Sequence, residues 1–205
     1  MKAFNGYDKA KEAAQRSGGI GRLPKGAYVC KILGVKYEEG KGGASNVLRV
    51  QFDITEGEYA GFFKKQYDEN KSDDKKFKGQ TTIYEPNDDG SERDDWTKKT
   101  FASWTNALEE SNKGYTWDWD EKKWKGKAIG IVFGETGTVI EGKEVVYTDA
   151  RYPVSVDKVR SGKAGEAKFK AKNGYGEKKS NDSGAEKGTD FINIPDGIDE
   201  ELPFA

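Results

Sequence analysis

Residues 61–67, GFFKKQY, combine aromatic and basic side chains in a way that could bind nucleic acid. Aromatic rings can stack on the bases of a single strand while Lys and Arg follow its phosphate backbone, and each stacked base contributes about 1–3 kcal/mol. Two earlier apolar stretches each add one basic residue to this cluster, namely Lys31 and Arg49. The candidate DNA-binding residues are therefore Lys31, Arg49, Phe62, Phe63, Lys64, Lys65 and Tyr67. The alternative hypothesis is that one or two of the rings belong to an ordinary core and the lysines to a solvated edge.

The chain ends in IDEELPFA, which forms a second candidate binding site. Three acidic residues precede three apolar ones, and the chain from Ser161 onward is too polar to bury them in a core. An apolar tip on such a segment is more typical of partner binding, because the acidic residues can meet basic residues of the partner. The candidate partner-binding residues are Asp199, Glu200, Glu201, Leu202, Pro203 and Phe204.

Residue types that serve most catalytic and metal sites are scarce. The chain has no histidine and a single cysteine, Cys30, which excludes Ser-His triads and the usual zinc sites. It contains no Gly-rich phosphate-binding loop, and Asp118 and Asp120 lack the glycine and distal glutamate of a calcium loop. We therefore expect a protein that is not an enzyme and uses no cofactor and no metal.

Composition predicts one domain with polar appendages. Of the 205 residues, 34% are hydrophobic and 35% charged, so burial must be concentrated in part of the chain. The net charge of −1 gives no global positive field, so nucleic-acid binding would need a local basic patch. The chain shows no signal-peptide pattern and no run of about 18 apolar residues, which predicts a cytoplasmic protein with no membrane partner.

Periodicity predicts the elements that must position these residues. Residues 23–37 form a long strand in which Gly34 predicts a β-bulge, so that one strand can serve two parts of a curved sheet. Residues 46–55 alternate cleanly, and residues 61–67 are predicted to form a third strand. On the second strand we expect a core face of Leu48, Val50, Phe52 and Ile54 and an outward face of Arg49, Gln51, Asp53 and Thr55.

The second half of the chain adds one helix and a hairpin. Residues 68–95 read as a partly mobile insertion in which only 81–84 resemble a strand. Apolar spacing predicts a helix over 100–110, a fourth strand follows at 127–133, and a hairpin turns at Glu141 and Gly142. Strands followed by one helix and further strands are typical of an OB-fold.

We therefore predict a mainly β chain built on an OB-fold five-stranded barrel, with one helix between strands 3 and 4 and a disordered C-terminal tail. The domains would be an arm with a short helix (1–22), the OB-fold single-stranded DNA-binding domain (23–160) and a linker ending in the acidic tip (161–205). The linker carries seven lysines and four acids over 161–188, and the tip region 189–205 carries five acids and no basic residue. A β-sandwich and an SH3-like barrel remain alternatives.

The stretch YTWDWDEKKW at 115–124 contains three tryptophans interleaved with acidic residues. The carboxylates of Asp118, Asp120 and Glu121 would repel phosphates. We therefore predict that these rings pack over one end of the barrel.

The tip Asp199-Glu200-Glu201-Leu202-Pro203-Phe204 resembles the acidic C-terminal tip of bacterial single-stranded DNA-binding proteins. That resemblance implies recruitment of replication, recombination and repair proteins, with the proline and phenylalanine docking in an apolar pocket. Ala205 departs from the family pattern, in which the phenylalanine itself is usually the last residue.

The stretches 23–35, 109–135 and 151–163 resemble a family of phage and prophage proteins of Gram-positive bacteria. The resemblance implies a single-stranded DNA-binding protein of phage DNA replication and recombination, which coats single-stranded DNA in the cytoplasm of an infected or lysogenic host. A protein-interaction module of the same machinery without DNA binding is one alternative, and carbohydrate binding through a tryptophan platform is another. The sequence leaves open whether the chain forms a homo-oligomer.

Overall fold

The computed structural model describes residues 21–42 and 44–176. The arm with a short helix predicted over 1–22 therefore lies almost wholly outside the described residues. The acidic tip, Asp199 to Phe204, lies outside them as well.

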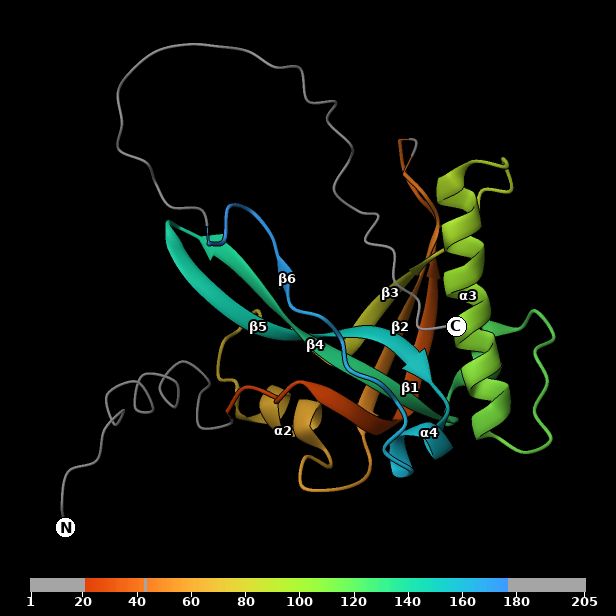
Figure 1. The fold of residues 1–205 in the computed structure, drawn as a ribbon, viewed down its shortest axis with the longest axis horizontal. Helices are drawn as coiled ribbons and strands as arrows, with labels where there is room; N and C mark the ends of the chain where they lie inside the picture. The colour runs from red at the N-terminus through yellow and green to blue at the C-terminus, as the bar shows by residue number, and fades with distance from the viewer. Residues whose placement is uncertain (1–20, 43, 177–205) are drawn as a thin grey trace.

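The described chain is mainly β, as predicted, and its strands form one sheet in the order β3-β2-β1-β4-β5, with β6 paired to β4 (Figure 1). All neighbouring strands run antiparallel except β4 and β6. The strands are β1 (Gly26–Glu38), β2 (Val47–Ile54), β3 (Gln80–Tyr84), β4 (Ala128–Ile140), β5 (Lys143–Val154) and β6 (Lys170–Ala171). The helices are α2 (Phe62–Glu69), α3 (Glu92–Ser111), the short 3-10 helix η1 (Glu121–Trp124) and α4 (Val156–Arg160).

Strand β1 belongs to both halves of the sheet. Residues 26–31 pair with β4, residues 30–38 pair with β2, and the register shifts between Ile32 and Gly34. The predicted bulge is therefore confirmed. On the side opposite β2, Ile32 exchanges backbone hydrogen bonds with residues 126–127, which precede β4. The bulge lets the strand turn from one partner to the other and curve the sheet.

The alternation predicted for β2 is confirmed with one exception. The four apolar residues predicted for its core face are buried, and Arg49 and Gln51 are exposed. Asp53, expected on the outward face, is only 8% exposed. Its carboxylate accepts backbone N–H bonds from Phe63 (3.0 Å) and Lys64 (3.1 Å). These two N–H groups belong to the first turn of α2, so Asp53 caps a helix that begins nine residues further along the chain.

The predicted third strand at 61–67 is wrong, because residues 62–69 form helix α2. Gly61, at φ 73°, starts the helix, and no side chain within α2 itself caps it. The capping carboxylate comes instead from Asp53 on β2. The third strand of the sheet is β3, which occupies the 81–84 stretch within the supposed insertion.

Helix α3 is longer than the predicted 100–110 and runs alongside the sheet in Figure 1. It buries Trp104, Ala107 and Leu108 in the core shared with β2, β3 and β4. Its place between β3 and β4 matches the prediction of one main helix in this position.

The β4–β5 hairpin projects beyond the rest of the sheet. Its turn lies at Glu141 (φ 51°) and Gly142 (φ 76°), as predicted, and positive φ at both positions fits the two-residue hairpin turn that suits twisted strands. Strand β1 stops pairing at Phe133, so β4 would have an unpaired edge from residue 134 onward. Strand β6 pairs with that edge at Thr136 and Gly137.

The prediction that a linker begins at Ser161 is therefore wrong for residues 161–176, because this segment packs against β4 through β6. At the other end of the described chain, Arg22 also reaches this hairpin. Its guanidinium pairs with Glu135 and donates to the Val146 carbonyl, and the Thr148 hydroxyl donates to the Leu23 carbonyl at 2.6 Å. Both terminal segments of the described chain thus contact the β4–β5 hairpin.

The two outermost strands of the main path, β3 and β5, are not joined by a ladder within the described residues. Between them lies a pocket of about 360 Å³, which we call the seam. Phe52, Phe63 and Phe133 line it from the core side, and Lys78, Gln80 and Tyr147 are among the residues at its rim.

Candidate nucleic-acid interface

The strand registers define one outward face across β1, β2 and β3. Cross-strand partners point to the same side of a sheet, so each register triple forms a row. We call these residues the outer face, and its rows are Glu38–Val47–Tyr84, Lys36–Arg49–Thr82 and Gly34–Gln51–Gln80, followed by the pair Lys31–Asp53. The opposite side carries the buried apolar residues of β2 and faces the core.

Basic groups lie at the centre of the outer face. Arg49 donates from Nε to Glu38 Oε2 (2.7 Å) and from Nη1 to the Thr82 hydroxyl (3.2 Å). Lys36 Nζ donates to the other oxygen of Glu38 at 3.1 Å. Hydrogen bonds from Arg49 and then Lys36 lower the pKa of Glu38. With Lys31 included, the face has three basic groups against two acids, the half-buried Glu38 and the buried Asp53, and this excess of one positive charge suits an anionic ligand.

An exposed aromatic ring lies at one end of the outer face. Tyr84 is 40% exposed, and the Arg93 guanidinium carbon lies 5.9 Å from the centre of its ring. Arg93, in the first turn of α3, also approaches the Ser45 hydroxyl of the β1–β2 loop at 3.4 Å. The ring therefore stands where the β1–β2 loop, β3 and the start of α3 meet.

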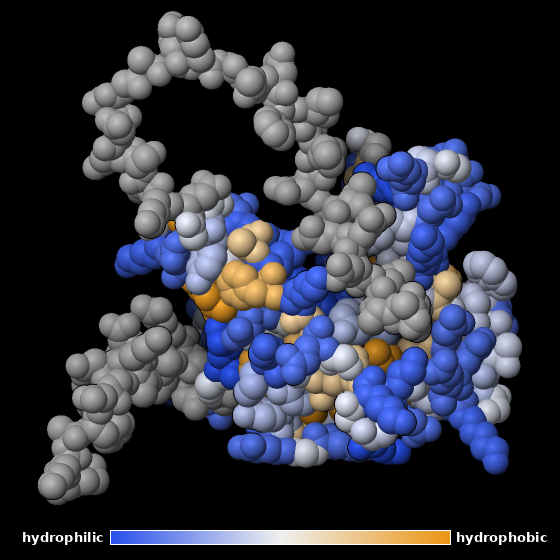
Figure 2. All heavy atoms as spheres, in the orientation of Figure 1, coloured by the Kyte–Doolittle hydropathy of each residue, from blue (hydrophilic) through white to orange (hydrophobic). Residues whose placement is uncertain are grey.

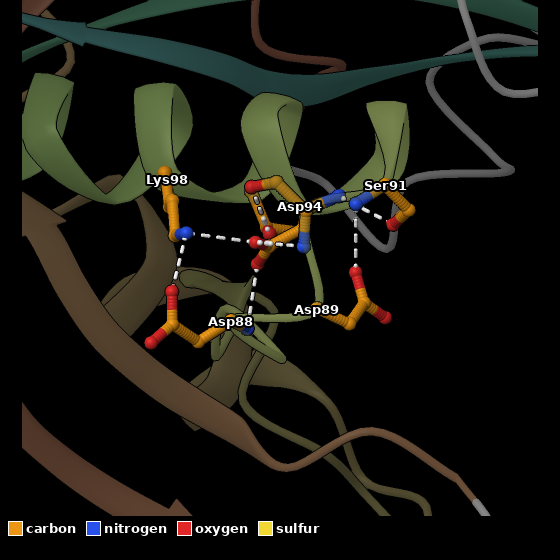
Figure 3. Close-up of polar contacts among 7 residues, drawn as sticks. Asp88, Asp89, Ser91, Asp94 and Lys98 are labelled. Atoms are coloured by element: carbon orange, nitrogen blue, oxygen red, sulfur yellow. Dashed lines mark hydrogen bonds and ion pairs between the residues drawn. The ribbon is translucent and has the colours of Figure 1, made fainter.

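A polar network fixes the start of α3 beside Tyr84 (Figure 3). The Ser91 hydroxyl caps the helix by accepting from the Asp94 N–H at 3.2 Å. The buried Asp94 carboxylate accepts from the Asp88 and Gly90 N–H groups, and Lys98 Nζ bridges Asp94 (2.8 Å) and Asp88 (2.6 Å). The hydrogen bond from Lys98 is the largest cause that lowers the pKa of Asp94, and the two backbone N–H groups lower it further.

The predicted DNA-binding residues do not form one surface. Lys31 and Arg49 lie on the outer face, but Phe62 and Phe63 are only 6% and 7% exposed. Phe63 stacks on Phe133 and packs edge-on against Phe52 and Phe62, so its ring is enclosed and cannot stack on a base. The hypothesis that these two rings stack on bases therefore conflicts with their positions in the core.

The other three predicted residues lie along α2. Lys64 is exposed and pairs with Asp68 at 2.6 Å, and Lys65 is exposed. Tyr67 is half-buried, with its ring edge-on to Phe77 and under the ammonium of Lys75. Asp53 links this helix to the outer face, because it is the cross-strand partner of Lys31 and accepts the Lys64 N–H.

Sequence reasoning missed several residues of the outer face. The alternation of β2 identified Arg49 and Gln51, and the same argument extended along β1 would have added Lys36. The residues contributed by β3 depend on the pairing of Arg49 with Thr82, which has no local signal. The missed residues are Lys36, Gln80, Thr82 and Tyr84.

The tryptophan-rich stretch divides into buried and exposed rings. Trp124 is fully buried, stacks on Trp104 at 6.4 Å and contacts Trp117 edge-on, which confirms the prediction of a packing role for this ring. Trp119 is instead 82% exposed, although its ring lies nearly parallel to that of Phe101 at 6.4 Å. Its backbone has φ 65°, an uncommon conformation for a bulky residue.

Hydrophilic residues cover most of the face seen in Figure 2, and apolar residues reach the surface over the β4–β5 hairpin. Among the described residues, no group of three or more Cys, Asp or Glu side chains is arranged to hold a metal ion. Within the same ranges, no helix has the length and apolar character needed to cross a membrane.

The sheet, its basic outer face and the exposed rings define a β-domain with a surface suited to an anionic, partly aromatic ligand. Comparison with protein-family models gives no match to this chain, and comparison with curated protein sequences gives none either.

Proposed function

We propose that this chain is a non-enzymatic single-stranded DNA-binding protein whose sheet is an OB-fold barrel and whose outer face holds the DNA. The observation that carries the proposal is the strand order β3-β2-β1-β4-β5, in which β1 is shared by β2 and β4 and α3 lies between β3 and β4. OB-folds have this sequence of elements, are often partly open, and bind oligonucleotides on the face of strands 2 and 3.

The chemistry of the outer face supports the same ligand. Lys31, Lys36 and Arg49 can contact successive phosphates, and Tyr84 offers a ring on which a base can stack. The carboxamides of Gln51 and Gln80 are exposed beside them and can donate and accept hydrogen bonds. A single strand, with accessible bases and a charged backbone, uses all three kinds of group.

The biological setting remains part of the proposal. We propose that the protein acts in phage DNA replication and recombination and recruits partner proteins through its acidic C-terminal tip. This rests on the resemblance of the tip and of residues 23–35, 109–135 and 151–163 described above.

Titration of a fluorescent oligo-dT of about 15 nucleotides tests DNA binding by anisotropy. We expect Tyr84→Ala to weaken binding about 5- to 150-fold, which corresponds to the loss of one stacked base worth about 1–3 kcal/mol. The double variant Lys36→Gln/Arg49→Gln should make the dependence of log affinity on log salt shallower by about 1.4, at about 0.7 per phosphate contact.

The matched control is Lys99→Gln/Lys125→Gln, which removes two exposed lysines outside the sheet and should leave the salt dependence unchanged. If the wild-type protein binds no single strand at low salt, the proposal is wrong. If both double variants reduce the salt dependence equally, binding is not centred on the outer face.

One observation favours a second function, that of a protein-interaction module. The exposed Trp119 lies between Asp118 and Asp120, whose charges oppose a phosphate backbone, and tryptophan is enriched among residues that dominate protein interfaces. Recovery of a replication or recombination protein that survives nuclease treatment and is lost in Trp119→Ala, without any oligonucleotide binding, would select this alternative.

A further inference from the structure

Residues 161–176, which we call the strap, concentrate positive charge on the β4–β5 hairpin. The strap contains four lysines and one glutamate, a net charge of +3, whereas residues 177–188 contain three lysines and three acids, a net charge of zero. The whole excess positive charge of the Lys- and Gly-rich region is therefore in the part that packs on the sheet. Three of its lysines alternate in the stretch Lys168-Phe169-Lys170-Ala171-Lys172.

One side of the strap is fixed to β4. A Cβ added to Gly137 would lie 2.7 Å from both the Phe169 and Tyr175 rings, so the glycine is needed for them to pack this closely. The Lys172 N–H donates to the Gly137 carbonyl at 2.9 Å, and the Asn173 side chain donates to the Thr138 hydroxyl at 3.2 Å. Gly137 and Ala171 are register partners, so Phe169 and Ala171 define the anchored side.

Lys170 belongs to the other side. Lys170 pairs in register with Thr136, and Thr136 pairs with Tyr147, so these three residues form a row. Lys168 and Lys172 flank the two-residue β6 on either side, and both are exposed, whereas Lys170 is half-buried. Arg151 lies in the same region, where its guanidinium donates to the Thr136 hydroxyl at 2.7 Å and pairs with the Asp149 carboxylate at 3.1 Å.

This row continues toward the outer face. Tyr147 and Gln80 both line the seam, and Gln80 is the register partner of Gln51. A path can therefore be followed from the Gln51–Gln80 row of the outer face, over the seam to Tyr147, and on to Lys170. Lys78 lies at the rim of the seam between the two parts.

We infer that the strap is a second nucleic-acid contact, in which Lys168, Lys170 and Lys172 hold the phosphates of a single strand that leaves the outer face and crosses the seam. This inference rests on the proposed function and extends it. Protection of the β4 edge explains Phe169 and Gly137, and lysines can also discourage edge-to-edge association of strands. These structural roles predict no effect of the lysines on DNA binding, so the two explanations can be separated.

The test uses the full chain and two oligo-dT probes, of about 6 and about 20 nucleotides, within and beyond typical OB-fold site sizes. The variant Lys168→Gln/Lys170→Gln/Lys172→Gln should bind the short probe as the wild type does. For the long probe, its salt dependence should be shallower by about 2, because three phosphate contacts at about 0.7 each are lost. The control triple Lys99→Gln/Lys113→Gln/Lys125→Gln removes the same charge from α3 and its following loops and should match the wild type.

A second variant tests the geometry without changing the charge. Gly137→Val places a side chain where Phe169 and Tyr175 pack and should displace the strap, so we expect it too to weaken binding of the long probe alone. The inference is overturned if the lysine triple leaves the long-probe salt dependence unchanged, or if the control triple reduces it equally. Failure of the wild type to bind either probe would instead refute the proposed function itself.

Discussion

Two aromatic clusters occupy different parts of the molecule and differ in one respect. The first contains Phe52, Phe62, Phe63 and Phe133, all of them buried. The second contains Phe101, Trp104, Trp117, Trp119 and Trp124, and it leaves the Trp119 indole in solvent. Phe62 and Phe63, which the sequence predicts to bind DNA, are buried in the core. Trp119, which the sequence predicts to pack on the domain, is exposed.

The difference lies in the backbone that carries the rings. Phe62 and Phe63 are on a helix whose first turn is held by Asp53, so both rings are directed into the core. Trp119 is on an irregular segment with a left-handed backbone, and its ring is 82% exposed although it contacts Phe101 and Trp117. The exposure of a ring in these two clusters therefore follows from the conformation of the segment that carries it, and not from the charge of the neighbouring residues.

The largest effect should come from Phe63→Ala, which would show that the phenylalanine cluster is structural. We expect the free energy of unfolding to fall by about 3–5 kcal/mol, since a buried ring is replaced by a cavity. Urea denaturation measures this, with the exposed Lys65→Ala on the same helix as control. A loss below about 1 kcal/mol together with weaker DNA binding would mean that this ring contacts the ligand after all.

A smaller effect should follow from Asp53→Ala, because the first turn of α2 would lose the acceptor of two backbone N–H groups. We expect a loss of about 1–2 kcal/mol in the free energy of unfolding, in the range of helix caps. Gln51→Ala, on the same strand but exposed, should change little. Equal stability of the two variants would show that α2 does not depend on this cap.

The tryptophan cluster depends on α3, so its stability should respond to pH through Asp94. The pKa of Asp94 is lowered in the folded protein, so its stabilising contribution is present above the unfolded carboxyl value of 3.8 and is lost as the pH falls through the folded value. At neutral pH we expect the wild type to have a higher urea midpoint than Asp94→Asn. In acid the two midpoints should become equal.

The control for that pH series is Asp95→Asn, which changes an exposed carboxylate in the same first helical turn. Its difference from wild type should be small throughout. A constant difference between wild type and Asp94→Asn from neutral to acid pH would contradict the assigned role of the Asp94 carboxylate.

The smallest effect on stability should come from Trp119→Gly. The exposed ring contributes little burial and glycine adopts positive φ without strain, so we expect a change within about 0.5 kcal/mol. The same variant should lower the fraction of tryptophan emission that iodide quenches, because Trp119 is 82% exposed, whereas Trp96, at 45%, stays accessible and Trp104 and Trp124 are buried. Strong destabilisation would contradict this expectation, because it would show that the Trp119 ring stabilises its cluster by packing, as Phe63 does in the first cluster.

Local patterns predicted the parts of the fold whose partners are close in sequence. The alternation in β2, the bulge at Gly34 and the turn at Glu141 and Gly142 each follow from a few neighbouring residues. Helix α2 was missed because its cap, Asp53, comes from another element. The first turns of α3 were missed because they are mostly polar and are fixed by the network around Asp94.

The candidate interface was predictable only in part for the same reason. Arg49 and Lys31 follow from strand alternation alone, whereas Tyr84 and Thr82 join them through the pairing of β2 with β3. The strap has the composition of a linker, and its attachment depends on a parallel pairing with β4 and on the bare backbone of Gly137. Such long-range contacts leave no mark in the local sequence.

The contacts of both terminal segments with the β4–β5 hairpin have a consequence for folding order. A hairpin closed by a two-residue turn can form in about 1–10 μs without help from distant chain. Arg22 and Leu23, by contrast, must find partners more than 100 residues away, a search that loop-closure entropy slows. The hairpin is thus suited to form early and to act as the template on which the first and last described segments assemble, and unfolding should begin with their release.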